Sequence, residues 1–191
     1  MVGAVVLLAF AASRTDAQTY TAILNGPSES PPNASPGLGT GLFTLDGNLF
    51  TIAVSFSNLT APTTASHIHC CTASPFTGTA GVASQVPSYP GFPLGVTSGV
   101  FNNTFDLSLL SSYNPAFVAA NGGTAASAEA AFIAGLNSGH AYYNIHTTAF
   151  PSGEIRGFVV ATPEPASLLL LATGLLGIGA AARRRTSVIG A

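Results

Sequence analysis

The sequence predicts a mainly-β domain of antiparallel strands with two short helices, followed by a C-terminal apolar helix. Only 6% of the residues are charged, and the chain holds 21 glycines and 13 prolines, a composition typical of turn-rich β proteins. One segment, residues 48–58, alternates apolar and small polar side chains with a period of two. An uncharged run near each end brackets this domain.

The alternating segment predicts a strand that buries one face. Phe50, Ile52, Val54 and Phe56 point to one side of it, and small residues point to the other. We expect this strand to be central, with those four side chains in the core. Asp46-Gly47-Asn48 is a typical turn sequence, so residues 41–45 are expected to pair with the strand as a hairpin.

Further strands are predicted at residues 20–24, 141–147 and 154–160, with a turn at 151–153 between the last two. Asn114 followed by Pro115 predicts the start of a helix over residues 116–120.

Thr124 is placed to cap a second helix over residues 125–136, and Gly139 is expected to end it. His140 beside that glycine is interpreted as a residue of the helix C-cap. Residues 72–100 hold four prolines and five glycines and predict a long ordered loop.

The N-terminal residues 1–17 predict a signal peptide. Val2 to Ala12 is apolar, and a cleavage site is expected after Ala17. Because no Lys or Arg precedes the apolar run, the true start of the signal is expected to lie upstream of Met1.

The C-terminal residues 162–191 combine three features in order. Pro163, Glu164 and Pro165 form an extended linker, residues 166–182 are an uncharged run that predicts a transmembrane helix, and Arg183, Arg184 and Arg185 follow. This order resembles the PEP-CTERM sorting signal. The resemblance implies transient membrane insertion, processing by an exosortase-type protease, and release to the cell surface or medium. A permanent membrane anchor is the alternative.

The charge of the domain disfavours nucleic acid as a partner. Between residues 18 and 161 there are five acids and one base, a formal charge of −4 with His neutral. Phosphate binding needs clustered Lys and Arg, which this domain lacks.

Residues 18–161 resemble the CHRD domain family. The resemblance rests on Ser66-His67-Ile68-His69, on Tyr143-Asn144-Ile145-His146, on Gly153-Glu154-Ile155-Arg156-Gly157, and on the early Leu24-Asn25-Gly26 with Glu29. It implies an extracellular antiparallel β-sandwich, immunoglobulin-like or similar to Cu/Zn superoxide dismutase.

His67, His69 and His146 form the strongest candidate site. Two imidazoles at i and i+2 share one strand face, and a third from a neighbouring strand completes a set that suits Zn²⁺ or Cu²⁺. If the strand that carries His67 and His69 continues to residue 71, Cys71 lies on the same face and is a fourth candidate ligand. Asn144, Glu154 or Cys71 are candidates to hold the second ring nitrogens. The alternative is that all three histidines make structural hydrogen bonds only.

Three interpretations of Cys70-Cys71 remain open: a vicinal disulfide, thiolate ligands beside the histidines, or cross-links between chains. Glu154 and Arg156 share a strand face and are expected to form a structural ion pair. No catalytic motif with a defined nucleophile or phosphate loop is found in the sequence.

The sequence therefore favours an exported surface or matrix protein that is not an enzyme and has a binding or structural role, with an extracellular polysaccharide or protein as the candidate ligand. The alternative is a Cu- or Zn-binding domain with redox activity.

Overall fold

The computed structural model describes residues 17–163 and Thr173. The expected signal peptide and the expected helix at 166–182 lie outside these residues, apart from Ala17 and Thr173. Glu164, Pro165 and the three arginines of the sorting signal also lie outside them. Among the residues described, no helix is long and apolar enough to cross a membrane.

One eight-stranded antiparallel sheet forms the domain, in the order β4-β6-β7-β1-β2-β3-β5, with β8 paired to β1. The strands are β1 Gln18–Asn25, β2 Leu38–Asp46, β3 Leu49–Ser57, β4 Thr63–His69, β5 Gly99–Asp106, β6 Tyr142–Thr147, β7 Ile155–Phe158 and β8 Val160–Ala161. The helices are α1 Pro115–Ala120 and α2 Ala125–Asn137, with 3₁₀ turns η1 Gly26–Ser28 and η2 Leu110–Ser112.

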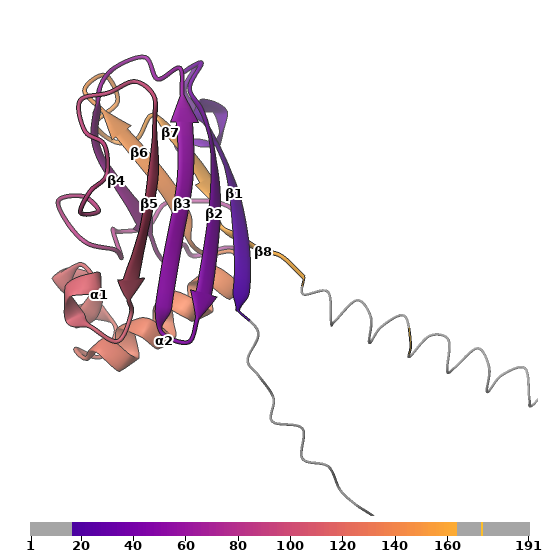
Figure 1. The fold of residues 1–191 in the computed structure, drawn as a ribbon, viewed down its shortest axis with the longest axis vertical. Coiled ribbons are helices and arrows are strands. Elements are labelled where there is room, and N and C mark those ends of the chain that lie inside the picture. The colour runs from indigo at the N-terminus through magenta and orange to yellow at the C-terminus, as the bar shows by residue number, and fades with distance from the viewer. Residues whose placement is uncertain (1–16, 164–172, 174–191) are drawn as a thin grey trace, which may run out of the picture.

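The mainly-β antiparallel fold with two short helices is confirmed. Its two layers are the two halves of a single sheet that curls into a half-barrel, with β4, β6 and β7 facing the half made by β1, β2, β3 and β5 (Figure 1).

β3 is the strand that the alternating pattern predicted. Phe50, Ile52, Val54 and Phe56 are all at most 4% exposed, which confirms their predicted place in the core. β3 pairs with β2 through the expected hairpin and with β5 on its other side. It is therefore an interior strand, although only β5 separates it from the sheet edge.

Aromatic side chains fill the space between the two halves. The ring of Phe43 on β2 lies 5.7 Å from that of Tyr143 on β6. α2 closes one end of the half-barrel, where Phe132 meets Phe50 edge to face at 5.6 Å (Figure 1). Such aromatic contacts stabilise the domain beyond the area that they bury.

The junction between the halves depends on Gly157 of β7. A Cβ atom at this position would lie 2.1 Å from the backbone oxygen of Ile23 on β1. Only a residue without a side chain lets the two strands approach this closely.

Both helix starts are as predicted. The side chain of Asn114 accepts a hydrogen bond from the Ala116 amide, and Thr124 forms a capping box with Ser127. α2 ends at Asn137, and Gly139, which follows the C-cap residue Ser138, adopts a φ of +73°. The His140 amide then donates to the Gly135 carbonyl, which confirms His140 as part of the C-cap.

The predicted long loop connects β4 to β5 and covers the outer face of the β4-β6-β7 half. Its carbonyl groups accept hydrogen bonds from side chains of that face, at Gly78, Ala80 and Pro87. As a result, all six residues of β6 are buried, on both faces of the sheet. This buried outer face holds the candidate site.

Candidate metal centre

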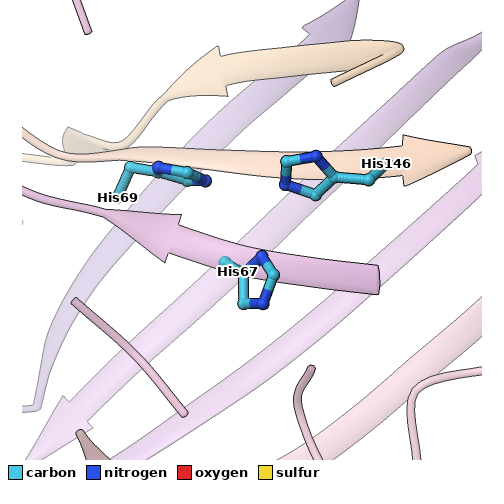
Figure 2. Close-up of side chains that lie close together, drawn as sticks. All are labelled: His67, His69 and His146. Carbon is cyan, nitrogen blue, oxygen red and sulfur yellow. The ribbon is translucent and has the colours of Figure 1, made fainter. Parts of the chain in front are cut away.

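The three predicted histidines come together on the outer face of two paired strands. His67 and His69 project from β4, and His146 projects from the antiparallel neighbour β6 (Figure 2). Asn144 lies directly opposite His67, so His146, two residues further along, lies diagonally across the strand pair. Side chains two residues apart share a face, which is why both strands deliver their imidazoles to the same side.

One ligand nitrogen from each ring lies within 4.8 Å of the others. The ring centroids are 5.2 Å apart for His67 and His146, and 5.7 Å apart for His69 and His146. Three nitrogens bound to one ion at about 2.0–2.1 Å lie about 3.3–3.6 Å apart, depending on whether the ion has four or three ligands. Ring movements on the order of an ångström would therefore bring all three nitrogens onto the same ion.

The second nitrogen of each ring is held by a backbone carbonyl of a covering loop. His67 Nε2 bonds to the Pro87 oxygen at 2.8 Å, and His69 Nδ1 bonds to the Ala80 oxygen at 2.9 Å. His146 Nδ1 bonds to the Pro151 oxygen at 3.0 Å. Because a carbonyl only accepts, each of these nitrogens carries the proton, and the other nitrogen of each neutral ring has a free lone pair.

Those free lone pairs are buried and unused. His67 Nδ1, His69 Nε2 and His146 Nε2 have no hydrogen-bond partner among the residues described. Leaving a buried acceptor unpaired costs about 1–3 kcal/mol, so three together are unusual in a purely structural cluster. Carbonyl-held imidazoles with the opposite nitrogens converging are the arrangement found around protein-bound metals.

Electrostatics keep the three rings neutral. Burial, reinforced by the neighbouring His146, lowers the pKa of His67 to about 4. Burial also lowers the pKa of His69 to about 4, although its bond to the Ala80 carbonyl acts in the opposite direction. The pKa of His146 is lowered by burial as well. Neutral imidazole is the form that binds metals.

A stack of rings and charges adjoins the cluster. The ring of Tyr142 lies parallel to that of His69 at 4.8 Å, and the Arg156 guanidinium lies over Tyr142 at 4.6 Å. Arg156 also donates to the carbonyls of Ser28 and Gly78.

The predicted ion pair between Glu154 and Arg156 is wrong. Arg156 Nε instead lies 3.8 Å from a carboxylate oxygen of Glu29. Glu154 precedes β7, so the regular alternation that would place it beside Arg156 has not yet begun. Its carboxylate accepts hydrogen bonds from Ser35, the Thr60 amide and Thr147. Burial opposes this, but the three donors lower the pKa of Glu154 overall.

Glu29 is a buried acid whose place the sequence did not reveal. Burial raises its pKa to about 7, while Arg156 acts in the opposite direction. Its Oε1 atom and the Asn144 Oδ1 atom both lack a hydrogen-bond partner within residues 17–163. Both atoms approach Gly153, where a Cβ would lie 2.7 Å from Glu29 Oε1 and 2.6 Å from Asn144 Oδ1.

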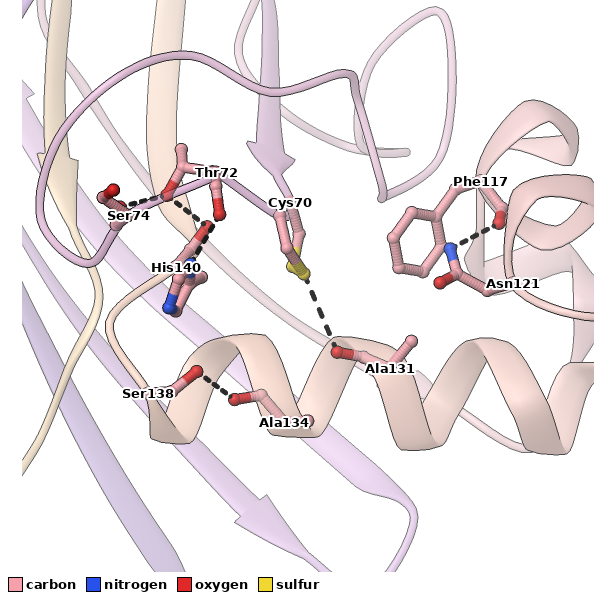
Figure 3. Close-up of a disulfide and its surroundings, with 10 residues drawn as sticks. Cys70, Thr72, Ser74, Phe117, Asn121, Ala131, Ala134, Ser138 and His140 are labelled. Atoms are coloured by element: carbon pink, nitrogen blue, oxygen red, sulfur yellow. Dashed lines mark hydrogen bonds between the residues drawn. A yellow bond between two sulfur atoms is a disulfide. The ribbon is translucent and has the colours of Figure 1, made fainter.

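Cys71 is not brought to the histidines. β4 ends at His69, and Cys70 and Cys71 form a vicinal disulfide that packs against α2 at Gly135 (Figure 3). Of the three open interpretations, the structure has the vicinal disulfide, and the expectation that Cys71 joins the metal ligands is wrong. The sulfur of Cys71 faces the Ala131 carbonyl of α2.

Sequence reasoning found the three histidines but not the groups that orient them. Asn144, Glu154 and Cys71 were the expected partners, whereas the observed partners are backbone carbonyls of Ala80, Pro87 and Pro151. Every residue has a carbonyl, so no residue type marked these positions. The available signals were the density of proline and glycine in the 72–100 loop and the predicted turn at 151–153, which contains Pro151.

Two family models match the chain. The CHRD domain model matches residues 20–159, and the PEP-CTERM protein-sorting motif matches residues 161–185. No curated protein and no solved structure matches it.

Proposed function

Since this chain belongs to the CHRD domain family and carries a PEP-CTERM sorting motif, we propose that it is an exported, non-enzymatic domain that binds one transition metal ion. His67, His69 and His146 are the proposed ligands. The observation that carries the proposal is the convergence of three buried lone pairs with no hydrogen-bond partner.

The sorting motif makes the chain a substrate of an exosortase, and so an exported protein. We propose that cleavage near Pro163 to Pro165 follows transient membrane insertion and releases the domain to the cell surface or medium. Intact-mass measurement of the mature protein tests this. The expected mass excludes Arg183 to Arg185, and a mass that includes them would refute cleavage.

The chemistry of the site supports metal binding over the purely structural alternative. A structural role accounts for one nitrogen of each ring, since each ties a loop carbonyl to the sheet. It leaves the three opposite nitrogens without a function. Imidazole nitrogen is a good ligand for Zn and Cu, and a bound ion would satisfy all three at once.

The neighbouring charged groups support a binding role rather than catalysis. Glu154 is held by three hydrogen bonds, and Arg156 is held by Glu29 and two carbonyls. A general acid or an anion-binding arginine needs to face a reacting group, and both side chains are directed elsewhere.

Metal analysis of the purified domain tests the proposal. After exposure to Zn²⁺ or to copper and removal of excess, we expect one equivalent of metal per chain. His67→Ala should weaken the affinity by more than about 100-fold, as expected for loss of a ligand. His140→Ala, which removes the one other histidine of the chain, should retain full metal content. If the purified domain binds no metal while remaining folded, the histidines are structural.

A further inference from the structure

The three-histidine site contains no anionic ligand. Among residues 17–163, the candidate ligand group that includes these histidines consists of imidazoles alone. Each ring is neutral by its hydrogen-bond pattern, because one nitrogen donates to a carbonyl and the other lacks a donor partner. The charge of the occupied site would therefore equal the charge of the ion.

Neighbouring charges do not compensate a cation. Arg156 is positive and is separated from His69 only by the ring of Tyr142. The carboxylate of Glu29 lies 3.8 Å from Arg156 Nε and so balances that arginine. Glu154 is engaged by Ser35, Thr60 and Thr147. A divalent ion would place two uncompensated charges in this buried face.

Burial makes the size of that charge decisive. The Born cost of transferring an ion from water to a protein interior grows with the square of its charge, so a monovalent ion costs about a quarter as much as a divalent ion of equal radius. Burial therefore favours a single positive charge.

The number of ligands that the site offers also favours a monovalent ion. Zn²⁺ in proteins is almost always four-coordinate, and with three protein ligands it takes a water or substrate in the fourth position. Here the three free nitrogens are shielded from solvent, and the loop carbonyls of Ala80 and Pro87 bond directly to the rings. Monovalent copper, by contrast, is stable with three ligands and needs none from solvent.

We propose that the site formed by His67, His69 and His146 is selective for monovalent copper. This inference rests on the proposed metal-binding function and specifies its ion. It implies that the protein binds Cu(I) more tightly than Cu(II). The copper couple in the site should then have a more positive reduction potential than that of copper in water.

Competition titrations under anaerobic conditions test the selectivity. Cu(I) affinity is measured against bicinchoninate with ascorbate as reductant, and Zn(II) and Cu(II) affinities are measured against chromophoric chelators. We expect Cu(I) to bind at least about 100-fold more tightly than either divalent ion. X-ray absorption of the copper-loaded domain should show three nitrogen ligands and no fourth light atom.

A smaller ratio, or a four-coordinate ion with an oxygen ligand, would overturn the selectivity while leaving the metal-binding function intact. Failure to bind any of the three ions would instead refute the proposed function itself.

A substitution that adds a negative charge tests whether the lack of an anionic ligand causes the selectivity. Asn144 lies opposite His67 and two residues from His146, so Asn144→Asp places a carboxylate on the same face. We expect its ratio of Cu(I) to Zn(II) affinity to fall at least about tenfold below that of the wild type. Asn102→Asp adds the same charge to an exposed position on β5 and should leave the ratio unchanged. Equal ratios in all three proteins would contradict the charge argument.

Discussion

The two halves of the sheet present very different outer faces. On β1, β2, β3 and β5, the outward side chains are exposed threonines, serines and apolar residues, such as Ile23 at 72% and Val100 at 78% exposed. On β4 and β6, the outward side chains include three histidines that are at most 9% exposed. Both faces come from the same alternation of residues along a strand.

The difference is produced by the loop between β4 and β5, together with the β6–β7 turn whose Pro151 carbonyl holds His146. Where no loop covers the sheet, water can satisfy the hydrogen bonds of the outward polar groups. Thr40 there makes only a cross-strand hydrogen bond with Ser55. Where the loop covers the sheet, each outward polar group needs a buried partner. The histidines have such a partner for one nitrogen only. The covered face therefore holds the buried side-chain nitrogens that are free to bind a ligand.

The largest effect on stability is expected inside the half-barrel, on the inward face of the uncovered half. Phe56 is 4% exposed and stacks on Phe92 at 5.6 Å. Phe56→Ala should lower the free energy of unfolding by about 3–5 kcal/mol. Ser57→Ala, on the exposed face of the same strand, should change it by less than about 0.5 kcal/mol. Similar values for the two variants in denaturant titrations would contradict the assignment of faces.

The junction between the halves should be the next most sensitive position. Gly157→Ala forces a Cβ against the Ile23 backbone, which cannot rotate away as a side chain could. We expect a loss of about 1–3 kcal/mol in unfolding free energy. Gly81→Ala is the matched control, because a Cβ there meets nothing within 4 Å. An unchanged melting temperature for Gly157→Ala would show that β1 and β7 are further apart than described.

Sequence reasoning succeeded where one local pattern determined the outcome. The alternation in β3 and the caps of α1 and α2 each involve neighbouring residues, and all three predictions are confirmed. The pairing of Arg156 was mispredicted because its partner, Glu29, lies far away in the chain and is brought near by the turn η1. The site was half predictable for the same reason. The histidines follow strand periodicity, whereas the carbonyls that orient them depend on the paths of residues 70–98 and 148–154.

The covered face should also make stability depend on pH through Glu29. Its folded pKa of about 7 lies above the ordinary value of 4.5. Such a group contributes stability that is fully present below pH about 4.5 and is lost as the pH rises through about 7. We therefore compare the unfolding free energy of the wild type with that of Glu29→Gln. The advantage of the wild type should fall by on the order of 2 kcal/mol between pH 4.5 and pH 8. A difference that is constant with pH would show that folding does not shift the pKa of Glu29.

The vicinal disulfide should have the smallest effect. It closes no loop between distant residues, so its removal in a Cys70→Ser, Cys71→Ser double variant should cost at most about 1 kcal/mol. The metal content of this variant should equal that of the wild type, because neither sulfur belongs to the three-histidine group. Loss of the bound metal would show that a cysteine is a ligand after all.

The protonation of the histidine rings tests the central claim most directly. Two-dimensional ¹H–¹⁵N spectra of the imidazoles at pH 7 should show His67 protonated at Nε2, and His69 and His146 protonated at Nδ1, with no ring charged. One equivalent of metal should shift the three unprotonated nitrogens and leave His140 unchanged. Doubly protonated rings at pH 7, or a metal-induced shift confined to His140, would contradict the account.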